Sequence, residues 1–133
     1  MMFPHTVTIY NKYKSGNTEK WQRTVLHGVF WNSSKGAVIR KNGVASADGV
    51  QLIIPFTADQ NKAYCKPQEF AKLQDKSNHW TLQSKDMIVK GNLDYEIVKS
   101  SSELAQFDDV LAVSNVDTRD FGGILAHWEV SGK

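Results

Sequence analysis

The segment of residues 79–99, HWTLQSKDMIVKGNLDYEIVK, alternates apolar and polar residues and is interrupted by turn formers. The interruptions fall at residues 84–86, SKD, and at Gly91-Asn92. Period-two alternation places successive side chains on opposite faces of a strand. The segment therefore predicts two or three short strands joined by tight polar turns. Its apolar positions, which we expect to face the core, are Trp80, Leu82, Ile88, Tyr95 and Ile97.

Other runs also have strand character, because they are rich in β-branched and aromatic residues. Gly28 lies inside one of them and predicts a bulge or bend, and the polar residues 14–20 predict a hairpin loop. The loop at residues 117–123 is polar and contains a glycine pair, which is typical of a hairpin or an exposed contact loop. The predicted strands are His5–Asn11, Trp21–Trp31, Val50–Pro55, Asp109–Val116 and Ile124–Val130.

Two short helices are expected. The first spans residues 66–73, where Pro67 suits the first turn of a helix. The second spans residues 101–107, where Ser100 or Ser101 can cap the helix and Glu103 supplies the acid of a capping box.

A hairpin arm is predicted at about residues 36–48. The strand-like runs 37–40 and 44–47 flank Lys41-Asn42-Gly43, and Asn-Gly tolerates the positive φ of tight hairpin turns. The stem has few large apolar residues, so we expect the arm to become ordered against a partner.

This inventory of eight or nine strands, two minor helices and no long crossover predicts a mainly β chain. The expected architecture is a single-domain antiparallel β-barrel or sandwich over residues 1–133, with two short helices and an extended β-hairpin arm. Large aromatic rings in strands are expected to fill its interior. The expected structural core is Trp31, Trp80, Leu82, Ile88, Tyr95, Ile97 and Trp128.

Composition is that of an ordinary globular domain. The chain has 133 residues, of which 41% are hydrophobic and 23% charged, so one core is expected. The longest apolar runs are too short to cross a bilayer, and the first residues lack the features of a secretory signal, so synthesis in the cytoplasm is expected.

Cys65 is the single cysteine, which excludes an intrachain disulfide. Both charge signs occur throughout, and a net charge of +2 is too weak to argue for nucleic acid.

No common catalytic or phosphate-binding motif occurs, and no cofactor or metal is expected. The histidines His5, His27, His79 and His127 lie more than twenty residues apart and lack the spacing of a zinc site. The aspartates at positions 108, 109, 117 and 120 are explained by turn and cap chemistry. Arg119 lies between two of them and predicts either an ion pair that shapes the loop or a contact across a subunit boundary.

Two segments carry a resemblance to a known group of proteins. The first is Trp80-Thr81-Leu82-Gln83, Asp86 and Ile88-Val89-Lys90-Gly91, which gives W-x-L-x-x-x-D-x-I-V-x-G. The second is Asp117-Thr118-Arg119-Asp120, Gly122-Gly123 and His127-Trp128-Glu129-Val130. Together they resemble small structural proteins from the head–tail connector region of tailed phages and prophages, of the head-closure (stopper), tail-completion or minor capsid type. The likeness extends from Thr6 to Val130.

The resemblance implies a non-enzymatic β-barrel subunit that joins a ring between portal and tail, found in the virion or, during assembly, in the host cytoplasm. Its partners would be portal or adaptor proteins and tail-completion or tail-tube proteins. A ring needs contacts between two different patches, and the arm and the 117–123 loop are the candidates. In a stopper-like role Lys12, Lys14, Lys20 and Arg23, or Arg40 and Lys41, could meet DNA phosphate. The interface residues are Val38, Ile39, Arg40, Lys41, Asn42, Gly43, Val44, Asp117, Arg119, Asp120, Phe121 and Gly122.

Two other classes of function stay open on the residues alone. One is a small β-barrel binding module for a ligand or single-stranded nucleic acid, with Trp21 between Lys20 and Arg23 as a local stacking platform. The other is a hydrolytic enzyme that uses Asp86 or His127.

Overall fold

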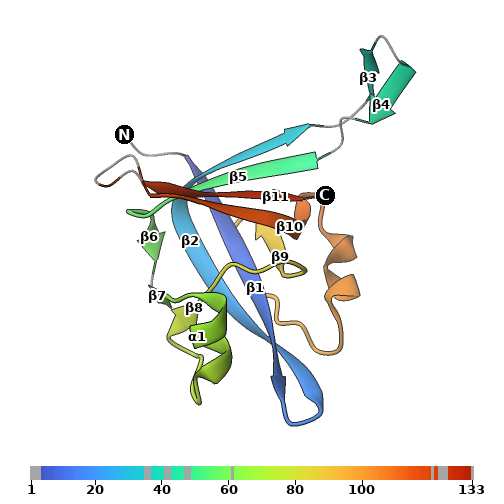
Figure 1. The fold of residues 1–133 in the computed structure, drawn as a ribbon. Coiled ribbons are helices and arrows are strands. Elements are labelled where there is room, and N and C mark those ends of the chain that lie inside the picture. Colours follow the sequence, from blue (N-terminus) through green and yellow to red (C-terminus); the bar gives the residue numbers. More distant parts are fainter. Residues whose placement is uncertain are drawn as a thin grey trace.

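The computed structural model describes residues 4–34, 37–40, 43–46, 49–60, 62–120, 122 and 126–132. The protein is mainly β: long twisted strands form its body, two short helices lie outside it and one hairpin extends away from it (Figure 1). The strands are β1 His5–Ser15, β2 Thr18–Ser34, β3 Ala37–Arg40, β4 Gly43–Ser46, β5 Gly49–Pro55, β6 Asp59–Gln60, β7 Ala63–Tyr64, β8 His79–Trp80, β9 Met87–Lys90, β10 Val110–Arg119 and β11 His127–Gly132. The helices are α1 Pro67–Lys72 and the 3-10 helix η1 Ser101–Gln106.

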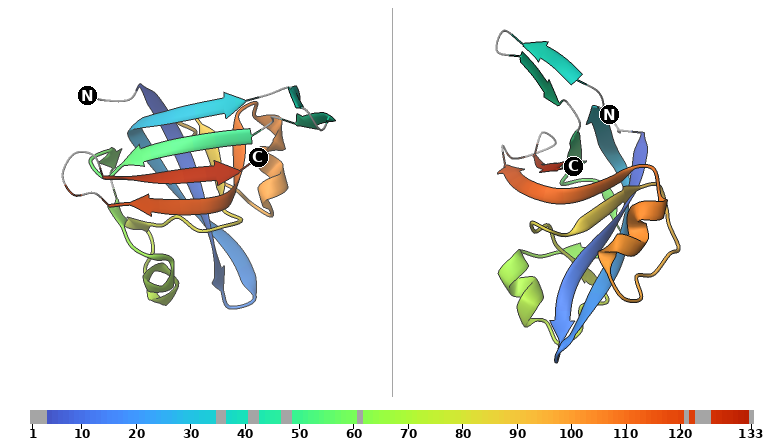
Figure 2. Two further views of the ribbon diagram at one scale, coloured as in Figure 1. Left: turned by 45° about the horizontal axis from the view of Figure 1, so that its top comes forward. Right: turned by 90° about the vertical axis from the view of Figure 1, so that its right-hand side faces the viewer.

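Six long or central strands form the body. They pair antiparallel in the order β1-β9-β10-β11-β5-β2, with β6 beside β2, and β1 also pairs with β2. Each of the six therefore has a neighbour on both sides, and the sheet folds over into a sandwich-like body (Figure 2). The antiparallel β class, the two short helices and the hairpin arm are confirmed.

Two strands bend from one layer of the body into the other. β2 pairs with β1 through residues 18–29 and with β5 through residues 30–34, and the register slips between His5 and Thr6, opposite Gly28. Gly28 has a φ of +82°, which favours glycine, so the predicted bulge is confirmed. β10 pairs first with β9 and then with β11, with a slip between Val113 and Asn115. Bulged strands of this kind form the corners of a folded sheet.

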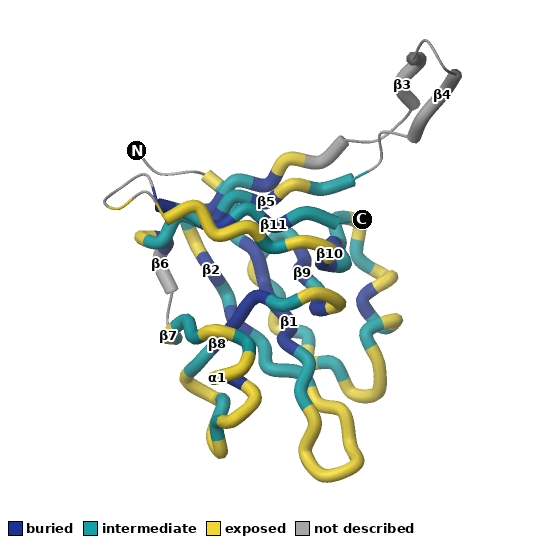
Figure 3. The backbone as a smooth tube through the Cα atoms, viewed as in Figure 1, coloured by how far each residue is buried: buried dark blue, intermediate teal, exposed yellow. Residues whose placement is uncertain are grey.

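The core has two parts. The larger cluster includes Trp31, Trp80, Leu82, Ile88 and Trp128, all buried. A second, smaller cluster of Tyr10, Val89 and Leu104 packs beneath η1, and Tyr95 and Ile97 pack against it half-buried. Buried positions concentrate in the middle of the body, whereas the tip of the β1–β2 hairpin is exposed (Figure 3).

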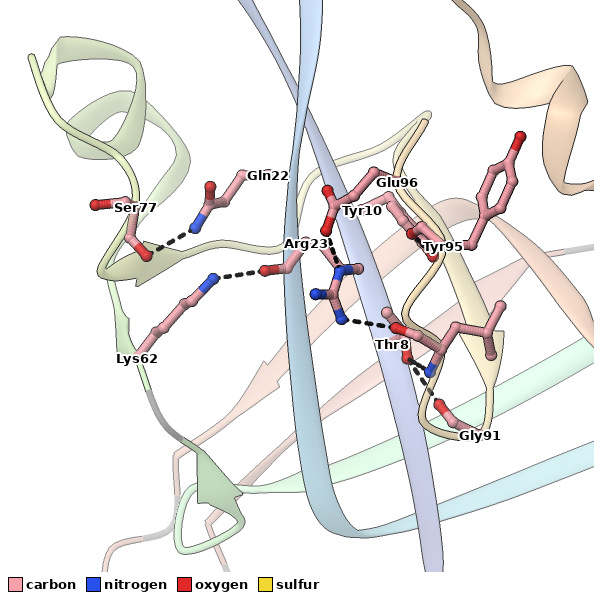
Figure 4. Close-up of polar contacts among 10 residues, drawn as sticks. Thr8, Tyr10, Gln22, Arg23, Lys62, Ser77, Gly91, Tyr95 and Glu96 are labelled. Atoms are coloured by element: carbon pink, nitrogen blue, oxygen red, sulfur yellow. Dashed lines mark hydrogen bonds and ion pairs between the residues drawn. The ribbon is translucent and has the colours of Figure 1, made fainter. Parts of the chain in front are cut away.

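The alternating segment 79–99 forms two strands, β8 and β9, and a third strand around Tyr95 is not present. Side chains of β1 and β2 satisfy the backbone of this segment in place of a ladder (Figure 4). Thr8 Oγ1 donates to Gly91 O at 2.7 Å, and Arg23 Nη1 donates to Leu93 O at 2.6 Å. Tyr10 OH donates to Tyr95 O at 2.8 Å. The apolar alternation at Tyr95 and Ile97 therefore indicates burial of one face without a strand partner.

Element ends differ from the prediction in several places. β1 and β2 continue through residues predicted as loop, with Lys14 opposite Glu19, and the turn is only Gly16-Asn17, where Gly16 has a φ of +65°. Within the described residues β11 spans His127–Gly132, and the predicted start at Ile124 lies outside them. The two-residue strands β6 and β7 were not predicted, and β7 pairs in parallel with β8.

Both helices lie within one residue of the predicted ranges, and both have the predicted start signals. Pro67 opens α1, and Ser100 with Glu103 forms the capping box of η1. Glu103 accepts hydrogen bonds from the backbone N–H of Val98 at 3.0 Å and Ser100 at 2.9 Å, and from Tyr95 OH at 2.7 Å. These donors, the Val98 N–H first among them, lower the pKa of Glu103 to about 2.

We expect Glu103→Gln to lower the melting temperature at pH 7. The melting temperature of this variant should also decrease less than that of wild type as the pH is lowered. A lowered folded-state pKa makes the Glu103 contribution fully present above about pH 4.5 and lost as the pH falls toward 2. Melting curves of wild type and Glu103→Gln between these pH values test this, with exposed Glu19→Gln as the control. Parallel curves for wild type and Glu103→Gln would contradict it.

Candidate functional site

The hairpin arm is the first candidate. β3 and β4 pair antiparallel in their own two-stranded sheet, with Val38 opposite Ala45 and Ile39 opposite Val44. Arg40 pairs with Gly43, so Gly43 belongs to a strand and not to the turn. Lys41 and Asn42 lie outside the described residues. The arm extends from the ends of β2 and β5 (Figure 1).

The first three residues of the predicted loop at residues 117–123 are strand. Asp117 and Arg119 lie in β10, opposite Glu129 and His127 of β11, because the β10–β11 ladder continues to residue 119. Asp120 follows the strand, Gly122 has a φ of +78°, and Phe121 is outside the described residues. This part of the prediction was wrong about the backbone, though Asp117, Arg119, Asp120 and Gly122 are all exposed.

Arg119 does make an ion pair, but with a partner that the sequence did not indicate. Its Nε lies 3.0 Å from Glu129 Oε2, and His127 Nε2 lies 3.1 Å from the same oxygen. Gln51 Nε2 donates to the other carboxylate oxygen at 3.1 Å. These contacts, with His127 the largest, lower the pKa of Glu129. The result is a polar patch across β5, β11 and β10.

The arm and this polar end lie at opposite ends of β11. Gly132 pairs with Val50 near the root of the arm, whereas His127 pairs with Pro55 and Arg119 at the other end. Two different patches at separate ends of one subunit are what a head-to-tail contact requires.

A basic groove is the third candidate, between the outer part of β1 and α1. Its volume is about 200 Å³, and it is lined by Lys12, Tyr13, Lys14, Phe70, Ala71, Lys76 and Gln83. Lys76 Nζ lies 5.2 Å from the centroid of the Tyr13 ring and 5.6 Å from that of Phe70. Cation–π contacts of this kind hold an ammonium in place without neutralising it.

The buried Asp86 holds the edge of β1 beside the groove. β9 pairs with β1 only through residues 7–10, and beyond them side chains bond to the β1 edge. Asp86 accepts from Lys12 N at 3.0 Å and Asn11 Nδ2 at 2.8 Å, and Gln83 Nε2 donates to Asp86 at 3.1 Å and to Lys12 O at 3.0 Å. Asn11 in turn bonds both backbone groups of Thr81. Asp86 is 2% exposed, so its carboxylate belongs to the interior.

Trp21 is the local stacking platform of the binding-module alternative. Trp21 is half-buried against the second core cluster, and the cation over its ring is Lys12, at 5.9 Å. Arg23 is engaged by Glu96, with a distance of 2.5 Å between Arg23 Nε and Glu96 Oε2 (Figure 4). Arg23 O also accepts from Lys62 Nζ at 2.6 Å.

Among the described residues no cluster of His, Cys, Asp and Glu has the composition to hold a metal ion. Asp86 is surrounded by amide and backbone donors, and His127 contacts Glu129. The structure thus gives these two residues separate partners. No helix of the described chain combines the length and apolar character needed to span a bilayer.

Comparison with known protein families gives a match over nearly the whole chain. The model of a family of unknown function (DUF6751) matches residues 2–133. The chain belongs to this family. No curated protein and no solved structure matches the chain. The DUF6751 match covers both segments that carry the phage resemblance and all three candidate sites.

Most residues that line the groove of this DUF6751 member could not be predicted from the sequence. Lys12 and Lys14 are two residues apart in a strand, which places them on one face and was a usable signal. Phe70, Lys76 and Gln83 come from segments 55 or more positions further along the chain, and no local pattern links them to β1.

Proposed function

We propose that this chain is a non-enzymatic structural subunit of a tailed-phage or prophage particle, which acts by assembly at the head–tail connector. The observation that carries the proposal is the β3–β4 arm. Within the described chain these strands pair with each other and with no strand of the body. The arm therefore offers two unpaired strand edges.

A two-stranded hairpin with four-residue strands is marginal in water unless something packs against it. Unpaired edges are templates for another strand, and strand addition is a common way in which β proteins associate. Val38, Ile39 and Val44 are β-branched, which suits a strand that is covered by a partner. The polar end at Arg119 supplies a second, different patch for the next subunit in a ring.

The resemblance to head–tail connector proteins adds support of another kind. Trp80, Leu82, Asp86 and Ile88 of its first segment are all buried. The shared pattern is therefore a pattern of the core, as expected for proteins that have structure and assembly in common.

Deleting residues 39–45 should leave a folded chain that no longer enters particles. The test replaces the gene in an inducible prophage, purifies the particles and measures the chain by mass spectrometry and infectivity by plaque counts. Circular dichroism of the purified deletion checks the fold. The control is Glu19→Gln, near the exposed tip of the β1–β2 hairpin, which should be incorporated normally.

Normal incorporation and infectivity of the deletion would overturn the role of the arm. Absence of the full-length chain from particles would overturn the virion assignment itself.

A further inference from the structure

The layer formed by β10, β11, β5 and the end of β2 has an open edge at β10 (Figure 2). β10 pairs with β9 only through residues 110–112, bends at the register slip between Val113 and Asn115, and then pairs with β11 alone. On the side away from β11, the backbone of residues 114–119 makes no hydrogen bond to any residue that the structure describes. An unpaired edge of this kind is a template for another strand.

Side chains cover the corresponding edges of β1 and β2. In β1, the backbone N–H and C=O of Lys12 bond to the side chains of Asp86 and Gln83. In β2, the carbonyl oxygen of Arg23 accepts from Lys62 Nζ at 2.6 Å. The β10 edge has no such cover within the described chain, so a strand could add there without displacing a hydrogen bond.

The core is incompletely closed beside this edge. Val116 of β10 packs against the larger core cluster but is only half-buried. Trp128 lies opposite Thr118 on β11, and the centroids of the half-buried rings of Phe56 and Tyr64 lie 4.3 and 4.4 Å from that of Trp128. A strand added beyond β10 would reduce the exposure of Val116, which is favourable.

The β3–β4 arm has the dimensions to occupy this edge. Its strands have four residues each, and the open part of β10 offers six. The arm projects away from the body at the ends of β2 and β5, whereas the open edge continues toward the opposite end of β11 (Figure 1). An edge that receives the arm therefore belongs to another molecule.

Charge favours a second copy of this chain as that molecule. Residues 35–48, which include the arm, contain three basic residues and one acidic residue. At the open edge Asp117 and Asp120 are exposed, and the charge of Arg119 is offset by Glu129 at 3.0 Å. A basic arm thus meets an acidic edge, whereas two arms would repel each other.

We propose that the β3–β4 arm of one copy adds as a strand to the β10 edge, at residues 114–119, of a second copy. The arm and the edge are different surfaces of one chain, so this contact continues from copy to copy or closes into a ring. The inference rests on the assembly role of the arm in the proposed function and names the surface that receives the arm. It requires no other virion protein.

Sedimentation velocity of the purified chain, at concentrations up to about 500 µM, measures the association. Asp117→Arg/Asp120→Arg should weaken it about tenfold, because attractive charge pairs become repulsive. Arg40→Asp/Lys41→Asp should weaken it similarly, and the combination of all four substitutions should restore most of the affinity. Asp94→Arg/Asp108→Arg is the matched control, since it makes the same charge change at exposed positions away from β10, and it should change the affinity by less than about twofold.

Hydrogen exchange of the same samples identifies the paired strands. The amides of residues 114–119 and of β3 and β4 should exchange more slowly at high than at low protein concentration. In the deletion of residues 39–45, which should be monomeric, exchange at residues 114–119 should not depend on concentration. A chain that stays monomeric, protection of the arm without β10, or equal losses in Asp117→Arg/Asp120→Arg and its control would each overturn the proposal.

Particle incorporation separates this inference from the proposed function. If the purified chain associates through the arm and β10 but is absent from particles, the virion assignment fails and the strand pairing stands. If the chain enters particles through its arm but does not associate with itself, the strand pairing fails and the proposed function stands.

Discussion

Replacing Asp86 by Ala is expected to lower the free energy of unfolding by about 3 kcal/mol at pH 7, measured by urea denaturation. The substitution removes the acceptor for Asn11 Nδ2, Lys12 N and Gln83 Nε2. Donors left unbonded in a buried site each cost about 1–3 kcal/mol. The exposed Asp108→Ala should cost less than about 0.5 kcal/mol, and an equal loss in both variants would contradict this role of Asp86.

The same carboxylate predicts an unusual pH dependence. Burial raises the pKa of Asp86 to about 6, against the opposing hydrogen bonds from Asn11, Lys12 and Gln83. The folded state therefore holds the proton more tightly than the unfolded state, whose pKa is 3.8. This stabilisation is full below about pH 4 and is lost as the pH rises through 6, by about 3 kcal/mol in total.

Asp86→Asn removes the titrating group and should flatten the stability curve between about pH 4 and 6. Glu103 acts in the opposite direction and in a lower window, because its pKa is lowered to about 2. Wild-type stability should therefore pass through a maximum near pH 4. Identical pH curves of wild type and Asp86→Asn above pH 4 would show that Asp86 does not titrate in this range.

Features determined by neighbouring residues could be predicted from the sequence. The alternation in β1, the bulge at Gly28, the capping box of Ser100 and Glu103, and the hairpin at Asn42-Gly43 each depend on residues a few positions apart. The structure shows each of these elements, although the hairpin register places Gly43 in a strand and Asn42 itself is outside the described residues.

Features that depend on distant partners could not be predicted. Asp86 is a turn former in the sequence, and its partners Asn11 and Lys12 lie about 75 positions away. The segment at Tyr95 alternates like a strand, but Thr8, Tyr10 and Arg23 occupy the backbone groups that a neighbouring strand would need. In both cases side chains make the hydrogen bonds to the backbone that a neighbouring strand would otherwise make. A period-two sequence pattern does not distinguish such a segment from a paired strand.

Trp80→Ala should cause a loss of about 4 kcal/mol in the free energy of unfolding, the largest expected from a single core position. Trp80 is fully buried, and its ring contacts Tyr64 at 5.0 Å and Trp128 at 5.5 Å between centroids. Its Nε1 donates to Lys62 O at 3.1 Å, which ties the segment before α1 to the core. The cavity left by the indole and the loss of this hydrogen bond act together.

Trp21→Ala is the matched control, because Trp21 is half-buried at the edge of the smaller cluster and should cost about half as much or less. Urea denaturation followed by far-ultraviolet circular dichroism measures both variants without relying on tryptophan fluorescence. Equal losses of unfolding free energy in Trp80→Ala and Trp21→Ala would contradict this prediction, which rests on the deeper burial of the Trp80 ring. Because Trp80 begins the segment that carries the phage resemblance, Trp80→Phe should enter particles at any temperature at which it stays folded. Exclusion of folded Trp80→Phe from particles would instead give this core position a direct part in assembly.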